Sequence, residues 1–435
     1  MKPSTNYDVI IVGGRPAGAT LAIRLGHQGL RVLLLERAVF PCPHPASSPI
    51  IYGSSMALLD EIGANEADYA RGTPRIRNWV NEMYDRFRIS VPFPDAFGRN
   101  YGYALDRARF DAALWRLASS TPNVTALQPF AVQNLLWRDG VVVGVTGQTH
   151  SGQESFTAGC VVGADGRFST VAQKVAAQTY HVRNETPTTV YYAAWEDAEP
   201  CSDQEAVIHF CKPDEGFFFF LFDTADGLVN VCIEGQSKLF SPGPGQVEIF
   251  YMDMLRRYPL IWRRLARAKR VTPVHGMRNI RNLYRTAGGP GWMLVGDALH
   301  QKDPIDGQGI YDALFTAKTL SKELASWKLN DKPWAQAITD YNTAVQAETY
   351  EMYNVTLNQV KLNVYSNQSA DVNKFLYRWF GADEELNRRY ALLSVRAIPP
   401  TGWLPTTTLL NAASRGLLEN IRCFLARQPH PAEIC

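Results

Sequence analysis

The chain has 435 residues, of which 46% are hydrophobic and 20% are charged. This length and composition predict a globular protein with a large buried core and more than one domain. Lys and Arg together number 44 and Asp and Glu number 42, which gives a formal net charge of +2 without long runs of one sign. A nucleic-acid partner is therefore not expected.

The sequence runs from a short polar segment directly into an apolar strand. It contains no signal peptide and no window of about twenty apolar residues. We therefore expect a cytoplasmic protein without membrane contact. The seven cysteines are scattered without a C-x-x-C pair, and their odd number favours free thiols over a disulfide framework. We expect no metal site.

The first elements of the chain form a predicted βαβ unit. Tyr7–Val12 (YDVIIV) and Arg31–Glu36 (RVLLLE) are apolar runs typical of buried strands, and Ala17–Gly29 between them has helical spacing. The turn between the first strand and the helix reads GGRPAG.

This turn is similar to the G-x-G-x-x-G fingerprint, whose glycines let the backbone turn tightly and approach a pyrophosphate. Gly13 and Gly18 are kept, but Arg15 replaces the middle glycine. The Arg15 side chain either points away from the phosphates or turns its guanidinium toward them as a charge-assisted contact. Pro16 suits a first helical turn, and Glu36 lies about 20 residues after Gly13, where an acid meets the ribose.

The second half of the chain has a different pattern. Between residues 180 and 270, short aromatic or alternating runs such as GFFFFLF (216–222) are separated by Asp, Gly and Pro turns, which predicts an antiparallel sheet. From residue 310 onward helical spacing dominates. Near the C-terminus, four large apolar residues share one helical face, which we expect to pack onto the body of the protein. They are Leu410, Leu417, Ile421 and Phe424.

Two later stretches make the nucleotide assignment more specific. One is GCVVGADGRFSTVAQ (Gly159–Gln173), and the other is WMLVGDALHQKDPIDGQGIYDALFTAKTL (Trp292–Leu320). With the glycine turn, they make the chain resemble the FAD-dependent monooxygenase family related to p-hydroxybenzoate hydroxylase. This family belongs to a superfamily shared with geranylgeranyl reductases and flavin-dependent halogenases. The resemblance covers roughly residues 6–330.

The resemblance implies an α/β fold class with three parts. These are a Rossmann-like FAD-binding βαβ domain, an inserted antiparallel β-sheet domain for the substrate, and a C-terminal helical region. The expected boundaries are 1–75, 101–178 and 273–335 for the FAD-binding domain, 76–100 and 179–272 for the substrate-binding domain, and 336–435 for the helical region.

The resemblance also implies a non-covalent FAD site. Asp297 resembles an acid that binds the ribityl hydroxyls, and Asp165 one near the pyrophosphate that has been linked to both FAD and NAD(P)H. Arg107 resembles a flavin-contacting arginine, with Arg109 as the alternative, and Arg15 resembles an arginine variant of the turn. The other expected contacts are Gly13, Gly14, Pro16, Ala17 and Gly18 in the turn, Glu36 and Arg37 at the ribose, Val132 at the adenine, and Gly307, Gln308, Gly309 and Ile310 at the N1 and O2 edge of the flavin.

The motifs do not identify the catalytic residues. One face of the aromatic run could line a substrate pocket, because alternate residues of a strand share a face. His44 follows the second strand, where the family places residues at the edge of the flavin, and it is not expected to be catalytic. The expected substrate contacts are Phe218, Phe220, Phe222 and Pro304, and the candidate acid–base or charged groups are His300, Lys302 and Asp306, with Asp303 beside them.

Three reactions are compatible with this fold. A halogenase would carry W-x-W-x-I-P and an active-site lysine, and that pattern is absent from the sequence. A geranylgeranyl-type reductase would carry a Cys-Gly motif after the second strand and a Phe-Pro motif in the sheet, where this chain has PCPHPASSP and FFFFLFD. We therefore expect a monooxygenase in which NAD(P)H reduces FAD and O2 forms a flavin hydroperoxide that oxygenates an aromatic or polycyclic small molecule. An FAD-dependent reductase or dehydrogenase acting on an apolar substrate is the alternative, and a non-enzymatic flavin-binding protein is the third hypothesis.

Overall fold

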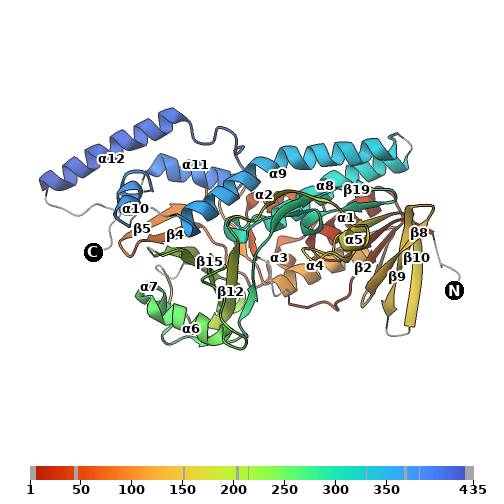
Figure 1. Cartoon of the computed structure of the whole chain (residues 1–435), viewed down its shortest axis with the longest axis horizontal. Coiled ribbons are helices and arrows are strands. Elements are labelled where there is room, and N and C mark those ends of the chain that lie inside the picture. The colour runs from red at the N-terminus through yellow and green to blue at the C-terminus, as the bar shows by residue number, and fades with distance from the viewer. Residues whose placement is uncertain are drawn as a thin grey trace.

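The computed structural model describes residues 6–43, 48–149, 152–201, 205–213, 215–329, 331–366, 370–381 and 383–426. In Figure 1, a mainly parallel sheet and its helices form the right-hand part of the molecule, and a second sheet lies in the left-hand part. The long helix α9 (Trp334–Val364) runs along both parts. His44, named above as a residue near the flavin edge, lies outside the described residues.

The first sheet contains the predicted βαβ unit. Strand β1 (Asn6–Val12) lies at its centre and pairs in parallel with β10 (Gly152–Gly163) and β2 (Val32–Leu35). The β1 residues Val9–Val12 are buried, as expected for a strand covered on both faces. The other strands of this sheet are β20 (Trp292–Leu294) and β7 (Val124–Leu127), both parallel, and the antiparallel β19 (Gly288–Gly289), β8 (Ala131–Arg138) and β9 (Val141–Thr149).

Helix α1 (Pro16–His27) packs between α4 (Arg107–Ser120) and α8 (Gly309–Lys328). Pro16 takes the first helical position of α1, where its missing N–H leaves no hydrogen bond unmade. The apolar sides of these helices and the first sheet form the largest buried cluster of the protein. Shorter helices around this sheet are α2 (Gly53–Asp60), α3 (Glu66–Tyr69) and α5 (Thr170–Lys174).

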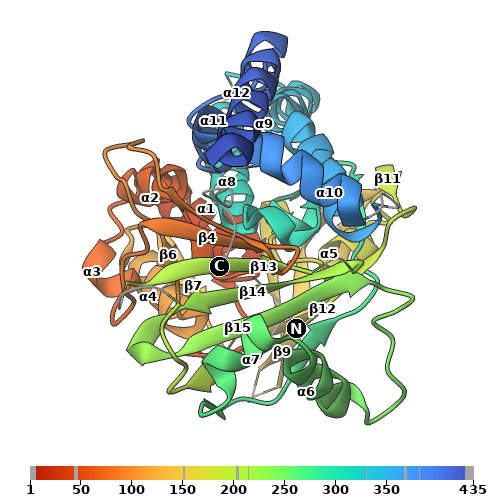
Figure 2. The ribbon, with the colours of Figure 1, turned by 90° about the vertical axis from the view of Figure 1, so that its left-hand side faces the viewer.

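The second sheet is predominantly antiparallel, and its strands lie next to one another across the view in Figure 2. Its order is β16-β12-β15-β14-β13-β4-β5, and β17 pairs with β12. Helices α6 (Val247–Arg257) and α7 (Pro259–Leu265) cover one face and form a second apolar cluster with it. The strands are β4 (Asn78–Met83), β5 (Phe87–Pro92), β12 (Thr188–Glu196), β13 (Val207–Lys212), β14 (Phe217–Asp223), β15 (Val229–Gln236), β16 (Lys269–Arg270) and β17 (His275–Met277).

This sheet combines residues from two separate parts of the chain, because β4 and β5 lie next to β13. It also continues past residue 272 through β17. Small strands connect the two sheets: β3 (Ile50–Ile51) pairs with β6 (Tyr103–Ala104), and β11 (Thr179–Arg183) with β18 (Asn282–Arg285) and then β21 (His300–Gln301). The α/β class with an antiparallel sheet and a helical C-terminal region is confirmed.

The C-terminal region is helical. The 31-residue helix α9 (Trp334–Val364) packs on α8 and reaches the second sheet (Figure 1). It is followed by α10 (Ala370–Leu376), a π-helical turn (Tyr377–Gly381), α11 (Glu384–Ser394) and α12 (Thr406–Ala426). Among the described residues, no helix combines the length and the apolar character needed to cross a membrane.

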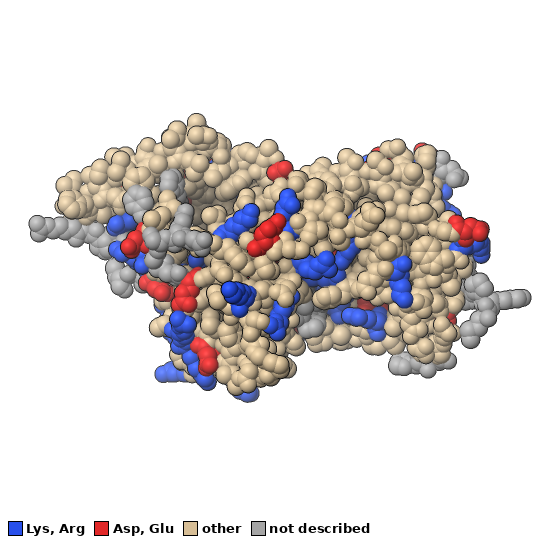
Figure 3. All heavy atoms as spheres, viewed as in Figure 1, with Lys and Arg blue, Asp and Glu red and all other residues tan. Residues whose placement is uncertain are grey.

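The expected orientation of α12 is wrong. Its buried residues are the small Ala412, Gly416 and Cys423, whereas the four apolar residues expected to pack inward are exposed. The small residues allow close contact, since a Cβ on Gly416 would lie 2.9 Å from the Trp379 carbonyl oxygen. The outer edge formed by α12 accordingly carries few charges in Figure 3. The outward-facing residues are Leu410 (63% exposed), Leu417 (47%), Ile421 (47%) and Phe424 (82%).

We expect Gly416→Val to detach α12 from the protein, because the added Cβ meets the backbone of Trp379. Limited trypsin digestion should then cleave α12 several-fold faster, at Arg415 or Arg422. Ser414→Val is the matched control, because it places the same β-branched residue on the exposed side of the same helix. Equal cleavage of the two variants would contradict the packing described for α12.

Candidate functional site

The turn after β1 has no room for side chains at its glycines. Gly13 has a φ of +107°, and a Cβ there would lie 2.4 Å from the Ala164 carbonyl oxygen at the end of β10. A Cβ on Gly18 would lie 1.8 Å from the Gly13 oxygen, and one on Gly14 would lie 2.5 Å from the Trp115 ring. The turn therefore brings the start of α1 directly against the ends of β1 and β10, and the first amides of the helix face outward there.

Glu36 is held beside this turn at the end of β2. The Gly14 N–H donates to Glu36 Oε2 at 2.8 Å, and the Ala38 N–H donates to Oε1 at 2.9 Å. The side chain is only 5% exposed. Each carboxylate oxygen retains a lone pair for a further donor, such as a ribose hydroxyl.

Arg15 turns toward α4. It forms an ion pair with Asp111, and its guanidinium carbon lies 5.4 Å from the centre of the Phe40 ring. Asp111 is fully buried and also pairs with Arg107 Nη2 at 3.0 Å. Arg15 thus helps to neutralise a buried carboxylate on a neighbouring helix.

The structure separates the two candidate arginines of α4. Arg107 is buried and pairs with the buried Asp111, and its positive charge opposes the rise in the pKa of Asp297 that burial causes. Arg109 is more exposed and binds Asp226 and the Arg71 carbonyl oxygen. Arg107 therefore lies in the interior, and Arg109 lies nearer the surface.

Asp165 organises the end of β10. It accepts hydrogen bonds from Ser169 Oγ at 2.5 Å and from the Thr170 N–H at 2.6 Å, and Ser169 caps α5. Burial raises the pKa of Asp165, and these hydrogen bonds oppose the shift. The residue thus fixes the backbone of its own loop.

Asp297 lies deep in the fold after β20, but its side chain is 35% exposed. Its partner is Arg167, with Nε 3.1 Å from Oδ2. Burial raises the pKa of Asp297, and the Arg167 charge opposes this. Part of the carboxylate therefore stays accessible to a further hydrogen-bond donor.

The loop before α8 leaves the N-terminus of that helix open. Gly307 has a φ of +66°, and an added Cβ on Gly309 would have no atom within 4 Å. Gln308 is held from the C-terminal region, because Arg396 Nε donates to Gln308 Oε1 at 2.8 Å. The first amides of α8, including that of Ile310, lack intrahelical partners and face an open region. The positive end of the helix dipole lies at the same place.

A buried charge cluster supports this loop. Lys302 Nζ lies 2.8 Å from Asp306 Oδ2 and 3.1 Å from Asp312 Oδ2. Arg396 Nη2 lies 3.2 Å from Asp312 Oδ1, and Thr356 Oγ1 of α9 donates to Asp306 at 2.7 Å. Since Lys302 and Asp306 neutralise one another inside the protein, they support the loop and are poorly placed as free acid–base groups.

His300 lies in an aromatic environment. Its ring stacks on Tyr284 with centroids 4.1 Å apart, and within the described residues neither ring nitrogen makes a hydrogen bond. Burial lowers the pKa of His300 to about 3, so the ring is neutral at physiological pH. It therefore contributes packing rather than charge.

The two faces of β14 have different neighbours. Phe217, Phe219 and Leu221 pack under α6 and α7, whereas Phe218, Phe220 and Phe222 lie on the opposite face of the sheet. Phe218 packs against Ile305, next to Pro304 in the loop before α8, and Phe222 is 4% exposed. Phe220 is only half-buried between these buried neighbours, so the face leaves room beside its ring. Half-buried residues on the same face are Tyr192, Phe210, Cys232 and Trp79.

A carboxyl pair lies at the edge of this aromatic face. Glu234 of β15 contacts Asp303, which accepts hydrogen bonds from Thr188 Oγ1 at 2.5 Å and from the Ile305 N–H at 3.0 Å. Burial raises the pKa of Glu234 well above its usual range, and the Asp303 charge adds to this. The pair therefore lies at the junction between the second sheet and the loop before α8.

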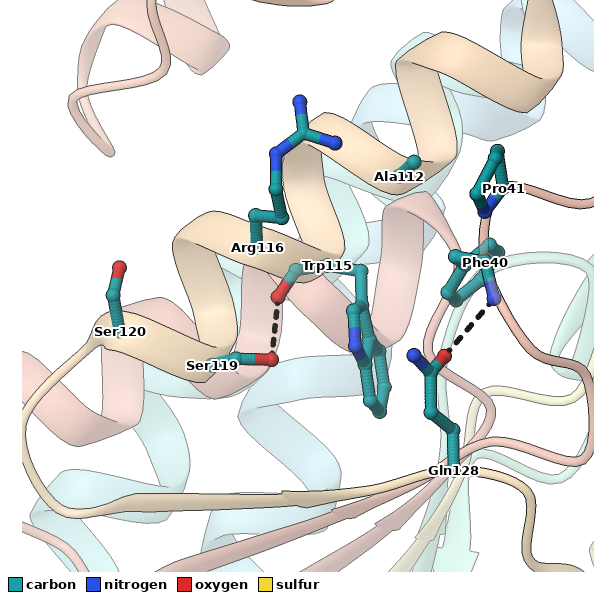
Figure 4. Close-up of a pocket in the computed structure, with 8 residues that line it drawn as sticks. All are labelled: Phe40, Pro41, Ala112, Trp115, Arg116, Ser119, Ser120 and Gln128. Carbon is teal, nitrogen blue, oxygen red and sulfur yellow. Dashed lines mark hydrogen bonds between the residues drawn. The ribbon is translucent and has the colours of Figure 1, made fainter.

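An open surface pocket of about 410 Å³ lies beside the glycine turn (Figure 4). One wall is Trp115 of α4, whose ring also contacts Gly14, and Phe40 and Gln128 lie opposite. The Phe40 N–H donates to Gln128 Oε1 at 3.2 Å. Near this region, Arg37 is exposed, and Val132 on β8 is half-buried against the main apolar cluster.

A parallel sheet with this glycine turn and an acid at the end of β2 defines a nucleotide-binding α/β protein. A family model described as an FAD binding domain matches residues 6–344. The chain therefore belongs to this FAD-binding family and is an FAD-dependent oxidoreductase. The predicted family is confirmed.

Individual relatives differ in the reactions that their names state. The digeranylgeranylglycerophospholipid reductase of Methanosphaerula palustris is 26% identical over 329 residues, which cover 72% of this chain and 75% of the relative. The p-nitrophenol 4-monooxygenase PnpA from Pseudomonas putida has a TM-score of 0.74 at 18% identity, covering 89% of this chain and 97% of its own. The flavin-dependent brominase Bmp2 has a TM-score of 0.74 at 19% identity, covering 94% and 99%. These two structures show the shared fold.

The sequence did not single out four residues that bind the motif residues in the folded chain. Asp111, Arg167, Asp312 and Arg396 each bind a residue that a motif had identified. Asp312 lies within the quoted motif and could have been found by its helical spacing from the loop. Arg396 had no local signal, because it reaches Gln308 only in the folded chain.

The neutral, buried His300 predicts a specific pH dependence of stability. The unfolded chain takes up this proton near the ordinary pKa of 6.5, whereas the folded chain takes it up only near 3. Ionisation of His300 therefore does not lower the free energy of unfolding above pH 6.5. As the pH falls from 6.5 toward 3, it lowers this free energy by up to about 1.4 kcal/mol per pH unit.

We expect His300→Phe, which keeps the stacking on Tyr284, to flatten this pH dependence. Urea unfolding at pH 7, 6 and 5 measures the free energy of unfolding of each variant. The exposed His27→Gln is the control and should follow the wild-type slope. Parallel curves for wild type and His300→Phe would show that His300 is not held neutral.

Proposed function

We propose that this chain is a monooxygenase that uses FAD, NAD(P)H and O2 to hydroxylate an aromatic or polycyclic small molecule. The observation that carries the proposal is the face of β14 on which Phe218, Phe220 and Phe222 point toward the loop before α8. Aromatic walls suit a flat apolar compound, and exclusion of water suits the reaction of a reduced flavin with oxygen.

The residues of the turn fit the adenosine and pyrophosphate parts of FAD. Gly13 and Gly18 leave the backbone bare at the start of α1, and Glu36 has lone pairs left for the ribose hydroxyls. Together with Gly14, Pro16 and Ala17, they form a cradle that side chains at the glycine positions would fill. We assign Arg15 to support of α4 through Asp111 rather than to direct phosphate binding.

A second group of residues fits the flavin end. Asp297 exposes its carboxylate to an internal space, where it would accept hydrogen bonds from the ribityl hydroxyls. The open N-terminus of α8 at Gly309 would stabilise negative charge on the adjacent edge of the ring. When bound, FAD supplies the redox chemistry, and the protein positions the substrate and excludes water.

A reductase acting on an apolar substrate is the second candidate. Glu234 and Asp303 favour it, because a buried carboxyl group with a raised pKa can donate a proton to one carbon of a double bond whose other carbon has received a hydride. The 26% identity to a digeranylgeranylglycerophospholipid reductase points in the same direction. In the monooxygenase, the same pair would only tie the sheet to the loop.

We expect the purified protein to carry one non-covalent FAD per chain, released by heat into the supernatant. Asp297→Ala should weaken FAD binding ten- to a hundredfold, because hydrogen bonds to a charged group contribute roughly 1.5–3 kcal/mol each. Arg15→Gly should retain FAD, and the surface variant Asp226→Ala is the control. Fluorescence titration of the apoprotein measures the three dissociation constants. Loss of FAD from Arg15→Gly would make the arginine a phosphate ligand and refute our assignment.

The reaction is tested by supplying reduced protein and a candidate aromatic substrate with isotopically labelled O2. The monooxygenase proposal predicts that mass spectrometry finds one labelled oxygen atom in the product. The reductase alternative predicts that the product gains two hydrogens in the absence of O2. It also predicts that Glu234→Gln slows this step more than it slows reoxidation of the flavin by O2. Peroxide release without labelled product would reject monooxygenation for that compound.

A further inference from the structure

A second cluster of ionisable groups lies on the α6 and α7 side of the second sheet, away from the flavin loop. His209 and Glu82 come from the neighbouring strands β13 and β4 and are fully buried. They share a face with Cys211, which packs under α6 and α7, whereas Phe210 points to the opposite side. The cluster is thus separated from the flavin site by the thickness of the sheet.

The centre of the cluster is a histidine with an oriented ring. His209 Nε2 lies 3.0 Å from Glu82 Oε2, so the ring donates there and leaves Nδ1 on the other side. Nδ1 lies 3.4 Å from Arg264 Nη1 and accepts from this guanidinium, and the Cys201 side chain lies against the same imidazole. Glu82 and His209 therefore help to orient Arg264 beside the cysteine.

Arginines surround the half-buried Cys201. Arg88 Nη2 lies 3.5 Å from Cys201 Sγ and donates to its carbonyl oxygen at 2.5 Å. Arg264 is 2% exposed and donates to the Glu199 carbonyl oxygen at 2.8 Å, which fixes its guanidinium beside the ring. Among the described residues, the charged groups facing the histidine and the thiol are Glu82 on β4, Arg88 on β5, Asp223 on β14 and Arg263 and Arg264 on α7.

The balance of these charges favours a thiolate. The three arginines outnumber Glu82 and Asp223 by one positive charge, which an anionic sulfur would neutralise. Burial alone would raise the pKa of Cys201, but the His209 hydrogen bond and the neighbouring positive charges lower it. Burial would lower the pKa of His209, and its contacts with Cys201 and Glu82 raise it instead. The surrounding positive charges therefore favour the anionic form of the sulfur.

We propose that Cys201 is a nucleophilic thiolate and a site of oxidative modification by hydroperoxides. The sulfur attacks one peroxide oxygen, so that an S–O bond forms as the O–O bond breaks. The sulfur loses two electrons, and the peroxide is reduced. The departing hydroxide takes a proton from solvent and leaves as water, which gives a sulfenic acid at Cys201.

Cys42 is an internal control for this proposal, because it is also half-buried but its thiol has only the Pro43 carbonyl oxygen as a hydrogen-bond partner within the described part of the chain. The holoprotein is treated with iodoacetamide at pH 6.5, and alkylation of each cysteine is followed by peptide mass spectrometry. We expect Cys201 to react at least tenfold faster than Cys42. Equal rates in the folded protein would overturn the proposal, and denatured protein provides the reference for the two peptides.

Variants of Arg88 test the source of the reactivity. Arg88→Gln should slow alkylation of Cys201 about tenfold at pH 6.5, and Arg88→Lys should restore most of the rate because it keeps the charge. Arg256→Gln, an exposed arginine of α6, is the matched control. An unchanged rate in Arg88→Gln with a normal circular dichroism spectrum would contradict the role of the charge.

The oxidation step is tested with hydrogen peroxide and dimedone, which traps sulfenic acids. We expect the dimedone adduct at Cys201 in the wild-type protein and its reversal when a thiol reductant is added before the trap. An adduct at Cys42 but not at Cys201 would overturn the proposal. The same measurement on protein stripped of FAD should give the same result, which separates this site from the flavin chemistry.

Discussion

Asp312 is the buried charge on which the arrangement around the flavin loop depends. Its carboxylate is 8% exposed and contacts both Lys302 and Arg396. Removing one partner from a buried pair typically costs about 3–5 kcal/mol, because the remaining charge is left uncompensated. These contacts join the segment before the loop, the first turn of α8 and the C-terminal region, so that the open N-terminus of α8 is held by groups far apart in the sequence.

The same loop is also fixed from the second sheet. Phe218 packs on Ile305 from the aromatic side, and Thr188 binds Asp303 from the polar side. The aromatic face of β14 therefore has a defined position relative to the α8 amides.

The sequence predicted the parts of the fold whose signals are local. The glycine turn, Glu36 and the aromatic run could be predicted from short-range spacing, because glycines in a turn, an acid at a strand end and alternating side chains in a strand are each recognisable within a few residues. Asp111 and Arg396 bind residues that are far away in the sequence, so no local pattern identifies them. The orientation of α12 was wrong for a related reason: its hydrophobic face indicated packing, but the small residues Ala412 and Gly416 provide the contact.

The central claim is that the flavin lies against the N-terminus of α8, with the aromatic face of β14 on its substrate side. A crystal structure of the FAD-loaded protein tests this most directly. We expect the pyrimidine edge of the flavin ring to lie within hydrogen-bond distance of the Gly309 or Ile310 amide. We also expect the ribityl chain to contact Asp297 and Phe220 to line the space in front of the ring. A flavin bound away from α8, with Asp297 making no contact to it, would contradict the account.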